Sequence, residues 1–209
     1  FWEGDSYKRQ MASGKYAYYY IGNDIWATDG TKESTLLIHK LLAEPPYYLN
    51  SCAFVEKTNN DNVYFAIQQG ANIMYPNELL VTNIKNKLAT KITENTTYKY
   101  KSSENGDLFF TMQESDNYWM CKYSLNLEEI VKLKTVSNSN ISMTAIGNDL
   151  YFFDSASKET HGLWHINPDT NEVVLLSEFT NRQSMPYFLV NKDDSAYFVI
   201  NKTPTSLDL

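Results

Sequence analysis

Short runs of apolar residues recur along the chain, and small polar residues bound each of them. Five of these runs are rich in aromatic residues: Tyr16–Tyr20, Asn62–Phe65, Asp107–Phe110, Asp149–Phe152 and Ser195–Phe198. Their aligned aromatic residues, Tyr18, Tyr64, Phe109, Tyr151 and Tyr197, are separated by 46, 45, 42 and 46 residues. Such an even spacing indicates an internal repeat of about 45 residues.

Three further runs can be placed in each repeat by the same spacing. The runs that precede the aromatic ones are Tyr7–Met11, Cys52–Val55, Tyr98–Lys101, Ile141–Ala145 and Tyr187–Val190. The third runs are Ile25–Asp29, Leu79–Asn83, Trp119–Tyr123 and Leu163–Asn167, and the fourth are Thr35–Lys40, Ala89–Thr93, Ile130–Leu133 and Val173–Leu176. Most are short runs of β-branched and aromatic residues between turn residues, which predicts β-strands. Four strands in about 45 residues are typical of a β-propeller blade.

We therefore predict an all-β fold, a β-propeller of about five four-stranded blades that forms one domain over residues 1–209. The fifth unit is incomplete, because only the stretch Lys202–Leu209 remains after its second strand and turn. Leu207–Leu209 is then a stub of the third strand, or the chain is cut within a longer array. Alternatively, Phe1 and Trp2 at the N-terminus close the last blade.

One segment is open to two interpretations. Thr35–Glu44 has the leucine content and the length of a helix, and Pro45 with Pro46 would end either kind of element. The register of the repeat favours a strand in its first half, and we predict a strand there.

The stretch Asp24–Thr31 (DIWATDGT) resembles the ELWxTDGT repeat of bacterial secreted and surface proteins. In that repeat a Leu-Trp strand leads into Ser/Thr-Asp-Gly-Thr and then into a short Val/Leu strand. The fourth unit keeps Leu163 and Trp164 but has Asn167–Thr170 in place of the turn, and the third unit lacks the turn signature. The resemblance implies a propeller-like array at a secreted or cell-surface location, and it brings no catalytic residue with it.

The charge of the chain argues against nucleic acid as a partner, and the length of its apolar runs argues against insertion into a membrane. The formal net charge is −7 with a pI near 5.0, and no stripe of Lys and Arg is present to neutralise phosphates, so we expect no nucleic-acid binding. The longest apolar runs are only a few residues, so we expect no insertion into a membrane.

Cys52 and Cys121 are predicted to be reduced, mostly buried thiols, with a bridge between them as the alternative.

No motif in the sequence indicates catalysis, a cofactor or a metal. The chain has no Gly-x-Ser-x-Gly elbow, no glycine-rich phosphate loop and no Asp-rich calcium loop. His161 and His165 are four residues apart, and we expect this spacing to align them only on a helix, whereas this stretch is predicted to be a loop followed by a strand. No Cys or carboxylate is placed to complete a zinc site with them.

The best-preserved motif has a structural explanation. Asp29, Gly30 and Thr31 suit a hairpin turn, because Gly permits positive φ while Asp and Thr bond to nearby backbone. Trp26 and Trp164 hold equivalent strand positions, and we expect both to pack between adjacent blades, with a partner for each indole N–H.

The connections between strands point to a possible binding surface. In an antiparallel four-stranded blade, the connections after the second and fourth strands share one face, which we call the loop face. These connections are richer in aromatic residues than the opposite ones, and tyrosine gives a large contact area at low entropic cost. The candidate ligand-binding residues are Tyr47, Tyr48, Tyr75, Tyr118, His161, Arg182, Gln183 and Tyr187.

The sequence thus favours a non-catalytic module that recognises a protein or a glycan through the loop face. One alternative is a structural role, as a spacer or adhesin segment of a longer repeat array. A third hypothesis is a hydrolase with its site in a central channel, for which no converging carboxylates are evident.

Overall fold

The computed structural model describes residues 10–21, 24–40, 51–57, 62–68, 78–83, 88–94, 96–138, 141–155, 161–179, 187–192 and 195–199. These residues form β-strands joined by turns, without a helix, and so include no helix that could span a membrane. The prediction of an all-β fold is confirmed.

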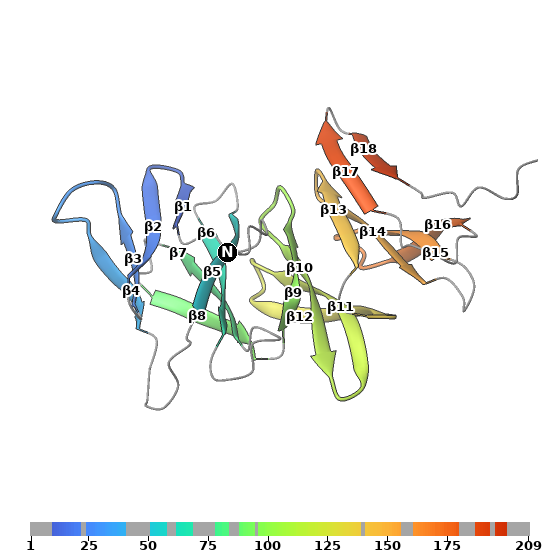
Figure 1. The fold of residues 1–209 in the computed structure, drawn as a ribbon, viewed down its shortest axis with the longest axis horizontal. Helices are drawn as coiled ribbons and strands as arrows, with labels where there is room; N and C mark the ends of the chain where they lie inside the picture. The colour runs from blue at the N-terminus through green and yellow to red at the C-terminus, as the bar shows by residue number, and fades with distance from the viewer. Residues whose placement is uncertain are drawn as a thin grey trace, which may run out of the picture.

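The strands form four sheets of four strands and a fifth of two (Figure 1). The first sheet contains β1 (Gln10–Ser13), β2 (Tyr16–Ile21), β3 (Asp24–Thr28) and β4 (Leu36–Lys40), and the second contains β5 (Ser51–Lys57), β6 (Asn62–Gln68), β7 (Glu78–Asn83) and β8 (Leu88–Thr93). The third contains β9 (Thr96–Ser102), β10 (Leu108–Glu114), β11 (Asn117–Ser124) and β12 (Glu129–Val136). The fourth contains β13 (Ser142–Ile146), β14 (Asp149–Ser155), β15 (His161–Ile166) and β16 (Val173–Phe179), and the fifth contains β17 (Tyr187–Lys192) and β18 (Ser195–Val199).

Within every sheet the strands pair antiparallel in chain order, as in a propeller blade. The observed strands overlap the predicted ones; of the first, predicted at Tyr7–Met11, residues 7–9 lie outside the described residues, and Gln10 and Met11 are in β1. Leu36–Lys40 is a strand, so the helical alternative for this half of the ambiguous segment is wrong. Phe1, Trp2 and Leu207–Leu209, which were considered for closing or extending the last blade, lie outside the described residues.

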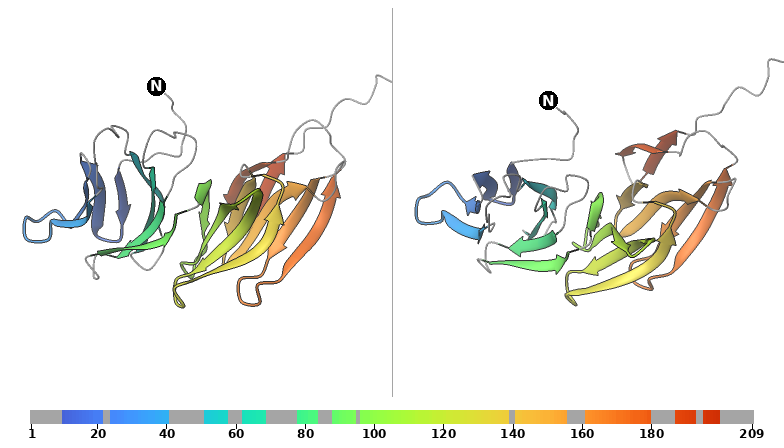
Figure 2. Two further views of the ribbon diagram at one scale, coloured as in Figure 1. Left: turned by 90° about the horizontal axis from the view of Figure 1, so that it is seen from below. Right: turned by 60° about the horizontal axis from the view of Figure 1, so that its bottom comes forward.

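The first four sheets follow one another along the longest axis of the molecule, and the fifth lies above the fourth in Figure 1; the first strands of neighbouring sheets lie side by side (Figures 1 and 2). β5 contacts β1 and β9, and β13 contacts β9 and β17. The first and fifth sheets are at opposite ends of the array, and no strand pairing between described residues joins them. The described part of the chain is therefore an open, propeller-type array.

Each inner sheet buries residues on both of its sides, because successive residues of a strand point to opposite sides. We call the side that turns toward the next sheet in the chain the forward side, and the other the backward side. In the second sheet, Val63 and Phe65 pack against the first sheet, whereas Tyr64 packs against the third. All three side chains are inaccessible to solvent.

Three apolar clusters fill the spaces between the first four sheets. The first consists of Tyr18, Ile25, Ala27, Ile38, Val63, Phe65 and Leu80. The second consists of Tyr64, Leu79, Val81, Leu108, Phe110, Met112, Cys121 and Tyr123, and the third of Phe109, Met120, Val136, Ile141, Leu150, Phe152 and Ile166. Removal of these side chains from water is the main force that holds neighbouring sheets together.

A β-bulge recurs at the same place in each of the four complete sheets, between the third and fourth strands. In the first sheet, Ile25 pairs with His39 but Trp26 pairs with Leu37, so Ile38 is the extra residue. The extra residues of the four sheets are Ile38, Ile92, Leu133 and Leu176. The first three lie in, or pack against, the cluster on the forward side of their sheet. The bulge therefore adds an aliphatic side chain to the following interface.

The equivalent tryptophans differ in their surroundings. Trp164 packs against the third cluster, with its ring stacked on Phe152 at 6.4 Å between ring centroids. Its predicted packing between blades is confirmed, but its indole nitrogen is buried without a partner among the described residues. Trp26 pairs with Tyr19 on the backward side of the first sheet, which is the outer side of the array, so packing between described sheets is not seen for it.

Cys121 is a free thiol inside the second cluster, as the sequence predicted. Burial raises the pKa of this thiol to about 12. Because Cys121 is free, the alternative of a bridge to Cys52 is wrong, and Cys121 acts as a small apolar residue of the core.

Hydrogen bonds also join adjacent sheets. The buried Tyr64 hydroxyl on β6 donates to the Gly106 carbonyl, in the turn between β9 and β10, at 2.7 Å. The Glu104 amide in that turn donates to the Gly147 carbonyl in the β13–β14 turn at 3.0 Å. The turn of the third sheet is thus tied to the sheets on both sides of it.

We expect Tyr64→Phe to lower the free energy of unfolding by about 1 kcal/mol, because it leaves the Gly106 carbonyl without this donor. Urea denaturation checks this value. Tyr197→Phe is the matched control, since Tyr197 is 57% exposed and its loss of a hydroxyl should change stability by less than about 0.5 kcal/mol. Equal effects of the two substitutions would show that the Tyr64 bond contributes nothing.

Candidate functional site

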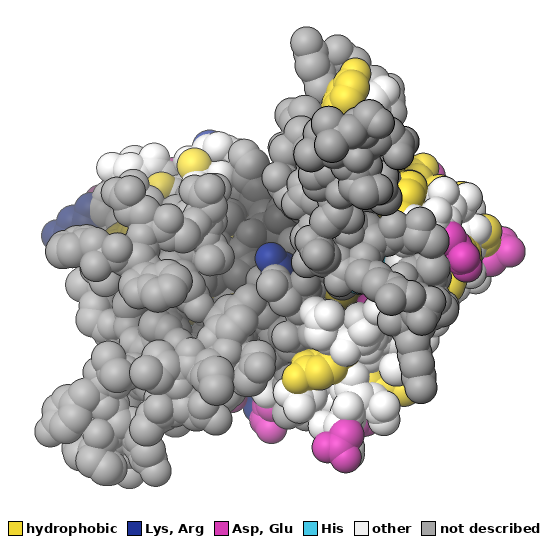
Figure 3. Space-filling view, turned by 45° about the vertical axis from the view of Figure 1, so that its right-hand side comes forward, with side chains coloured by type: hydrophobic (Ala, Val, Ile, Leu, Met, Phe, Trp, Pro, Cys, Tyr) yellow, Lys and Arg dark blue, Asp and Glu magenta, His cyan; other side chains and the backbone are white. Residues whose placement is uncertain are grey.

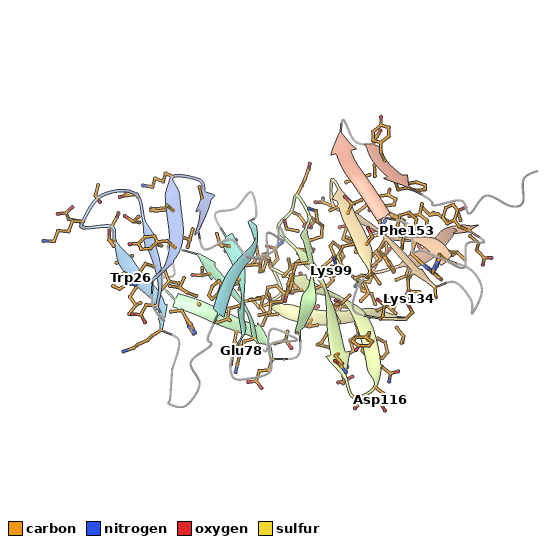
Figure 4. All side chains as sticks on the ribbon, viewed as in Figure 1. Trp26, Glu78, Lys99, Asp116, Lys134 and Phe153 are labelled. Atoms are coloured by element: carbon orange, nitrogen blue, oxygen red, sulfur yellow. The ribbon has the colours of Figure 1, made fainter. Side chains whose placement is uncertain are left out.

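The loop face carries the connections after the second and fourth strands of each sheet. The β10–β11 hairpin projects from it, and Asp116 lies at the hairpin tip (Figure 4). Of the candidate ligand-binding residues, Tyr118 lies on β11, His161 on β15 and Tyr187 on β17. The others, which are Tyr47, Tyr48, Tyr75, Arg182 and Gln183, lie outside the described residues.

The structure does not bring Tyr118 and His161 together. Tyr118 is partly buried and packs against the third cluster, between the third and fourth sheets. His161 pairs with Phe179, which contacts Phe198 of the fifth sheet, so it belongs to the forward side of the fourth sheet. The fourth sheet therefore lies between the two residues, and Tyr118 is in part a core residue.

The two histidines of β15 also differ from the expectation. Both lie on the strand, and residues four apart on a strand share a side, so a common orientation does not require a helix. At a rise of roughly 3.3 Å per residue, however, their backbones are about 13 Å apart. His165 instead lies 3.3 Å from the Asp149 carboxylate, and its ring is 4.9 Å from that of Tyr151. No group of three or more potential metal ligands occurs in the described part of the chain.

A group that the sequence analysis missed lies beside the turn of the projecting hairpin. Trp119, Glu114 and Lys132 come from three adjacent strands, β11, β10 and β12. The Lys132 ammonium lies 5.5 Å from the centre of the Trp119 ring and donates to the Glu114 carboxylate at 2.5 Å. Glu114 and Lys132 are 54% and 39% exposed, and the Trp119 ring is partly buried against the second cluster. We call these three residues the Trp119 group.

The hairpin register explains why these side chains meet. Glu114 pairs with Asn117 across the two-residue turn, and Met112 pairs with Trp119, so Glu114 and Trp119 point to the same side of the sheet. Lys132 reaches that side because the β-bulge shifts it opposite Cys121. The sequence shows a tight turn between Glu114 and Trp119, which is a signal for this pair. It does not show the β-bulge that brings Lys132 beside them.

A related ion-pair group lies at the loop-face end of the second sheet. Lys91 holds the position in β8 that Lys132 holds in β12, since it pairs with Leu80 as Lys132 pairs with Cys121. Its ammonium donates to the Glu94 carboxylate and lies 3.7 Å from that of Glu78. The hydrogen bond to Glu94 raises the pKa of Lys91, and the same bond lowers the pKa of Glu94.

Two other polar groups have structural roles. On the face opposite the loop face, the Asp29 carboxylate accepts bonds from the Thr31 amide at 3.1 Å and from the hydroxyls of Thr31 and Ser34. The bonds from Ser34 and Thr31 lower the pKa of Asp29, and Gly30 has a φ of 95°, so the predicted turn is confirmed. The hydrogen-bonding groups of Asp29 thus find their partners within the motif's own loop.

A buried ion pair joins the third and fourth sheets. The Lys134 ammonium lies 3.3 Å from the Asp154 carboxylate and 4.3 Å from the centre of the Trp164 ring. Asp154 also accepts from the Ser137 amide at 2.9 Å and from the Ser137 hydroxyl at 2.6 Å. Because Asp154 is 1% exposed, its carboxylate is held by partners within the interface and is not presented to a ligand.

Comparisons with known proteins support the fold alone. No protein-family model matches the chain, and no curated protein matches it. Among solved structures, an oligogalacturonate lyase in complex with manganese has a TM-score of 0.57 at 12% identity, over 90% of this chain and 56% of the lyase. An oligopeptidase B from Leishmania major has a TM-score of 0.49 at 15% identity, over 90% of this chain and 30% of its own. The likeness to the lyase supports a propeller-type fold, and this chain spans little more than half the lyase's length.

We expect one pH effect on stability from a histidine near this face. His39 lies on the forward side of the first sheet, 6.2 Å from Phe65 between ring centroids. Burial lowers its pKa from the ordinary 6.5, and the nearby Glu78 carboxylate opposes this only in part. Between the two values the unfolded chain binds more protons than the folded one, so stability is lost as the pH falls below about 6.5.

His39→Gln should therefore lose less stability than the natural chain when the pH is lowered from about 7.5 to about 5.5. Urea midpoints of both proteins at the two pH values measure the difference, and groups common to both proteins cancel in the comparison. Identical pH slopes would contradict the assignment to His39.

Proposed function

We propose that this protein is a non-catalytic interaction module that binds a protein or a glycan at the loop face. The Trp119 group is the observation that carries the proposal. It places an aromatic ring, an ammonium and a carboxylate together beside the turn of a projecting hairpin. Aromatic side chains bordered by polar groups are the residues that recognition surfaces use most.

The chemistry of the Trp119 group suits binding more than catalysis. An aromatic ring offers a flat apolar surface, while the paired charges offer a donor and an acceptor to a polar ligand. The pair is half exposed, and such pairs contribute only about 0–1 kcal/mol to stability. The charges can therefore be changed without loss of the fold, which makes the site testable.

The remaining charges of the described interfaces are occupied by structural contacts. Lys134 and Asp154 pair within one interface, and Lys122 donates to the Pro168 carbonyl at 2.5 Å across it. On the loop face, the Trp119 group combines exposed charge with an aromatic ring. The tyrosines proposed from the sequence, Tyr47 and Tyr75, belong to connections of the same face.

Glu114→Lys tests the proposal once a glycan array and a pull-down have supplied a ligand. We expect its Kd to rise about tenfold or more, because the reversed charge repels Lys132 and disturbs the surface around Trp119. Glu172→Lys makes the same change in the β15–β16 turn on the opposite face, where it should leave the Kd unchanged.

Two further variants separate the possible outcomes. The exchange Glu114→Lys with Lys132→Glu keeps an ion pair, so an exchange variant in which the ion pair is restored but binding is not locates the ligand at these charges. Tyr47→Ala with Tyr75→Ala tests the tyrosine connections in the same assay. An unchanged Kd in both the Glu114 and the tyrosine variants would exclude the loop face as the site.

A further inference from the structure

We propose that the partner at the loop face is a protein, and that one of its arginine side chains binds between the Trp119 ring and the Glu114 carboxylate. This inference rests on the proposed function and names the chemistry of the partner. In the structure the Lys132 ammonium already occupies this place, 5.5 Å from the centre of the ring and bonded to the carboxylate. A ring and a carboxylate that hold one cation have the chemistry to hold another.

The same combination of groups occurs at the interface between the third and fourth sheets. There the Lys134 ammonium lies 3.3 Å from the Asp154 carboxylate and 4.3 Å from the centre of the Trp164 ring. The lysine comes from the third sheet, whereas the carboxylate and the ring belong to the fourth. The protein thus already uses a tryptophan and a carboxylate to hold a cation that another sheet supplies.

The strand register gives the two places the same geometry. Asp154 lies two residues beyond the residue that pairs with Trp164. Glu114 likewise lies two residues beyond the residue that pairs with Trp119. In both sheets the carboxylate is therefore diagonal to the tryptophan on the neighbouring strand, and both side chains point to the same side of the sheet.

The two places differ in their exposure and in the source of the cation. The Asp154 side chain is 2% exposed, whereas that of Glu114 is 54% exposed and the Trp119 ring is only partly buried. The cation at Trp119 comes from the same sheet, and it lies farther from the ring than its counterpart at the interface does. Because the Lys132 side chain is 39% exposed, it can turn into water and yield its place to a second cation.

Arginine is the cation that suits this place best. Its planar guanidinium stacks on an indole ring and donates two parallel N–H bonds to one carboxylate, which an ammonium cannot do. Asp116 at the hairpin tip adds a second exposed carboxylate, and Figure 3 shows acidic and hydrophobic side chains close together at this lower end of the surface. The net charge of −7 attracts a basic partner from a distance, whereas an uncharged glycan gains nothing from it.

A synthetic peptide with the sequence Gly-Arg-Gly-Arg-Gly tests the inference. The same peptide with citrulline in place of both arginines is its matched control, because citrulline keeps the shape of arginine without the charge. Binding to the full chain is followed by the indole N–H signals of its four tryptophans in nitrogen-15 NMR spectra. We expect the Trp119 signal to shift saturably with the arginine peptide, and the citrulline peptide to bind at least about fivefold more weakly.

Variants of the chain locate the peptide. Glu114→Gln should weaken binding of the arginine peptide about threefold or more, whereas Lys132→Met should strengthen it about twofold or more, because it removes the internal competitor. The ion-pair group of the second sheet, which contains no tryptophan, supplies matched controls. Glu94→Gln and Lys91→Met make the same changes of charge there, and each should alter the affinity by less than about 1.5-fold.

Three results would overturn the inference: no saturable binding of the arginine peptide, equal affinities of the arginine and citrulline peptides, or equal effects of the variants in the second and third sheets. A different result would refute the arginine while the proposed function stands. This is a glycan whose binding depends on Glu114 but which the arginine peptide does not displace.

Discussion

Burial of apolar residues on both sides of each sheet is the constraint on which this structure depends. A strand such as β6 sends Val63 and Phe65 to one neighbour and Tyr64 to the other, so that its sequence is apolar throughout. A single sheet of this composition would expose both of its apolar sides to water. The sheets therefore have to stack, and the first strands, lying side by side, fix the order in which they do so. Among the described residues, the outer side of each end sheet has no neighbouring sheet.

The strands could be predicted from sequence because the signals for them are local. In the third unit, turn residues end at Asp107 and an aromatic run begins, and β10 starts at Leu108. The spacing of the repeat then allowed strands to be assigned where the local signals are weaker. One example is β4, whose sequence also suited a helix. The bulge accounts for that ambiguity, since the extra residue Ile38 follows Leu37 and breaks the alternation expected of a strand.

The candidate site could be predicted only in part, because it depends on contacts between strands. The loop-face connections were found from strand order alone, but the packing of Tyr118 depends on which side of β11 it occupies. The partners of Trp119 follow from the hairpin register and from a bulge in β12. His161 and His165 share a side of one strand, which the expected loop obscured. Pair contacts of this kind are set by tertiary register, which residue types do not specify.

The hydrogen bonds between neighbouring turns have a consequence for cooperativity. The turn between β9 and β10 is bonded to both the second and the fourth sheets, whereas the first and fifth sheets each adjoin one described sheet. Such an array behaves as a line of units coupled to their nearest neighbours. Opening should then begin at the two ends and move inward, with the third sheet the last to lose its structure.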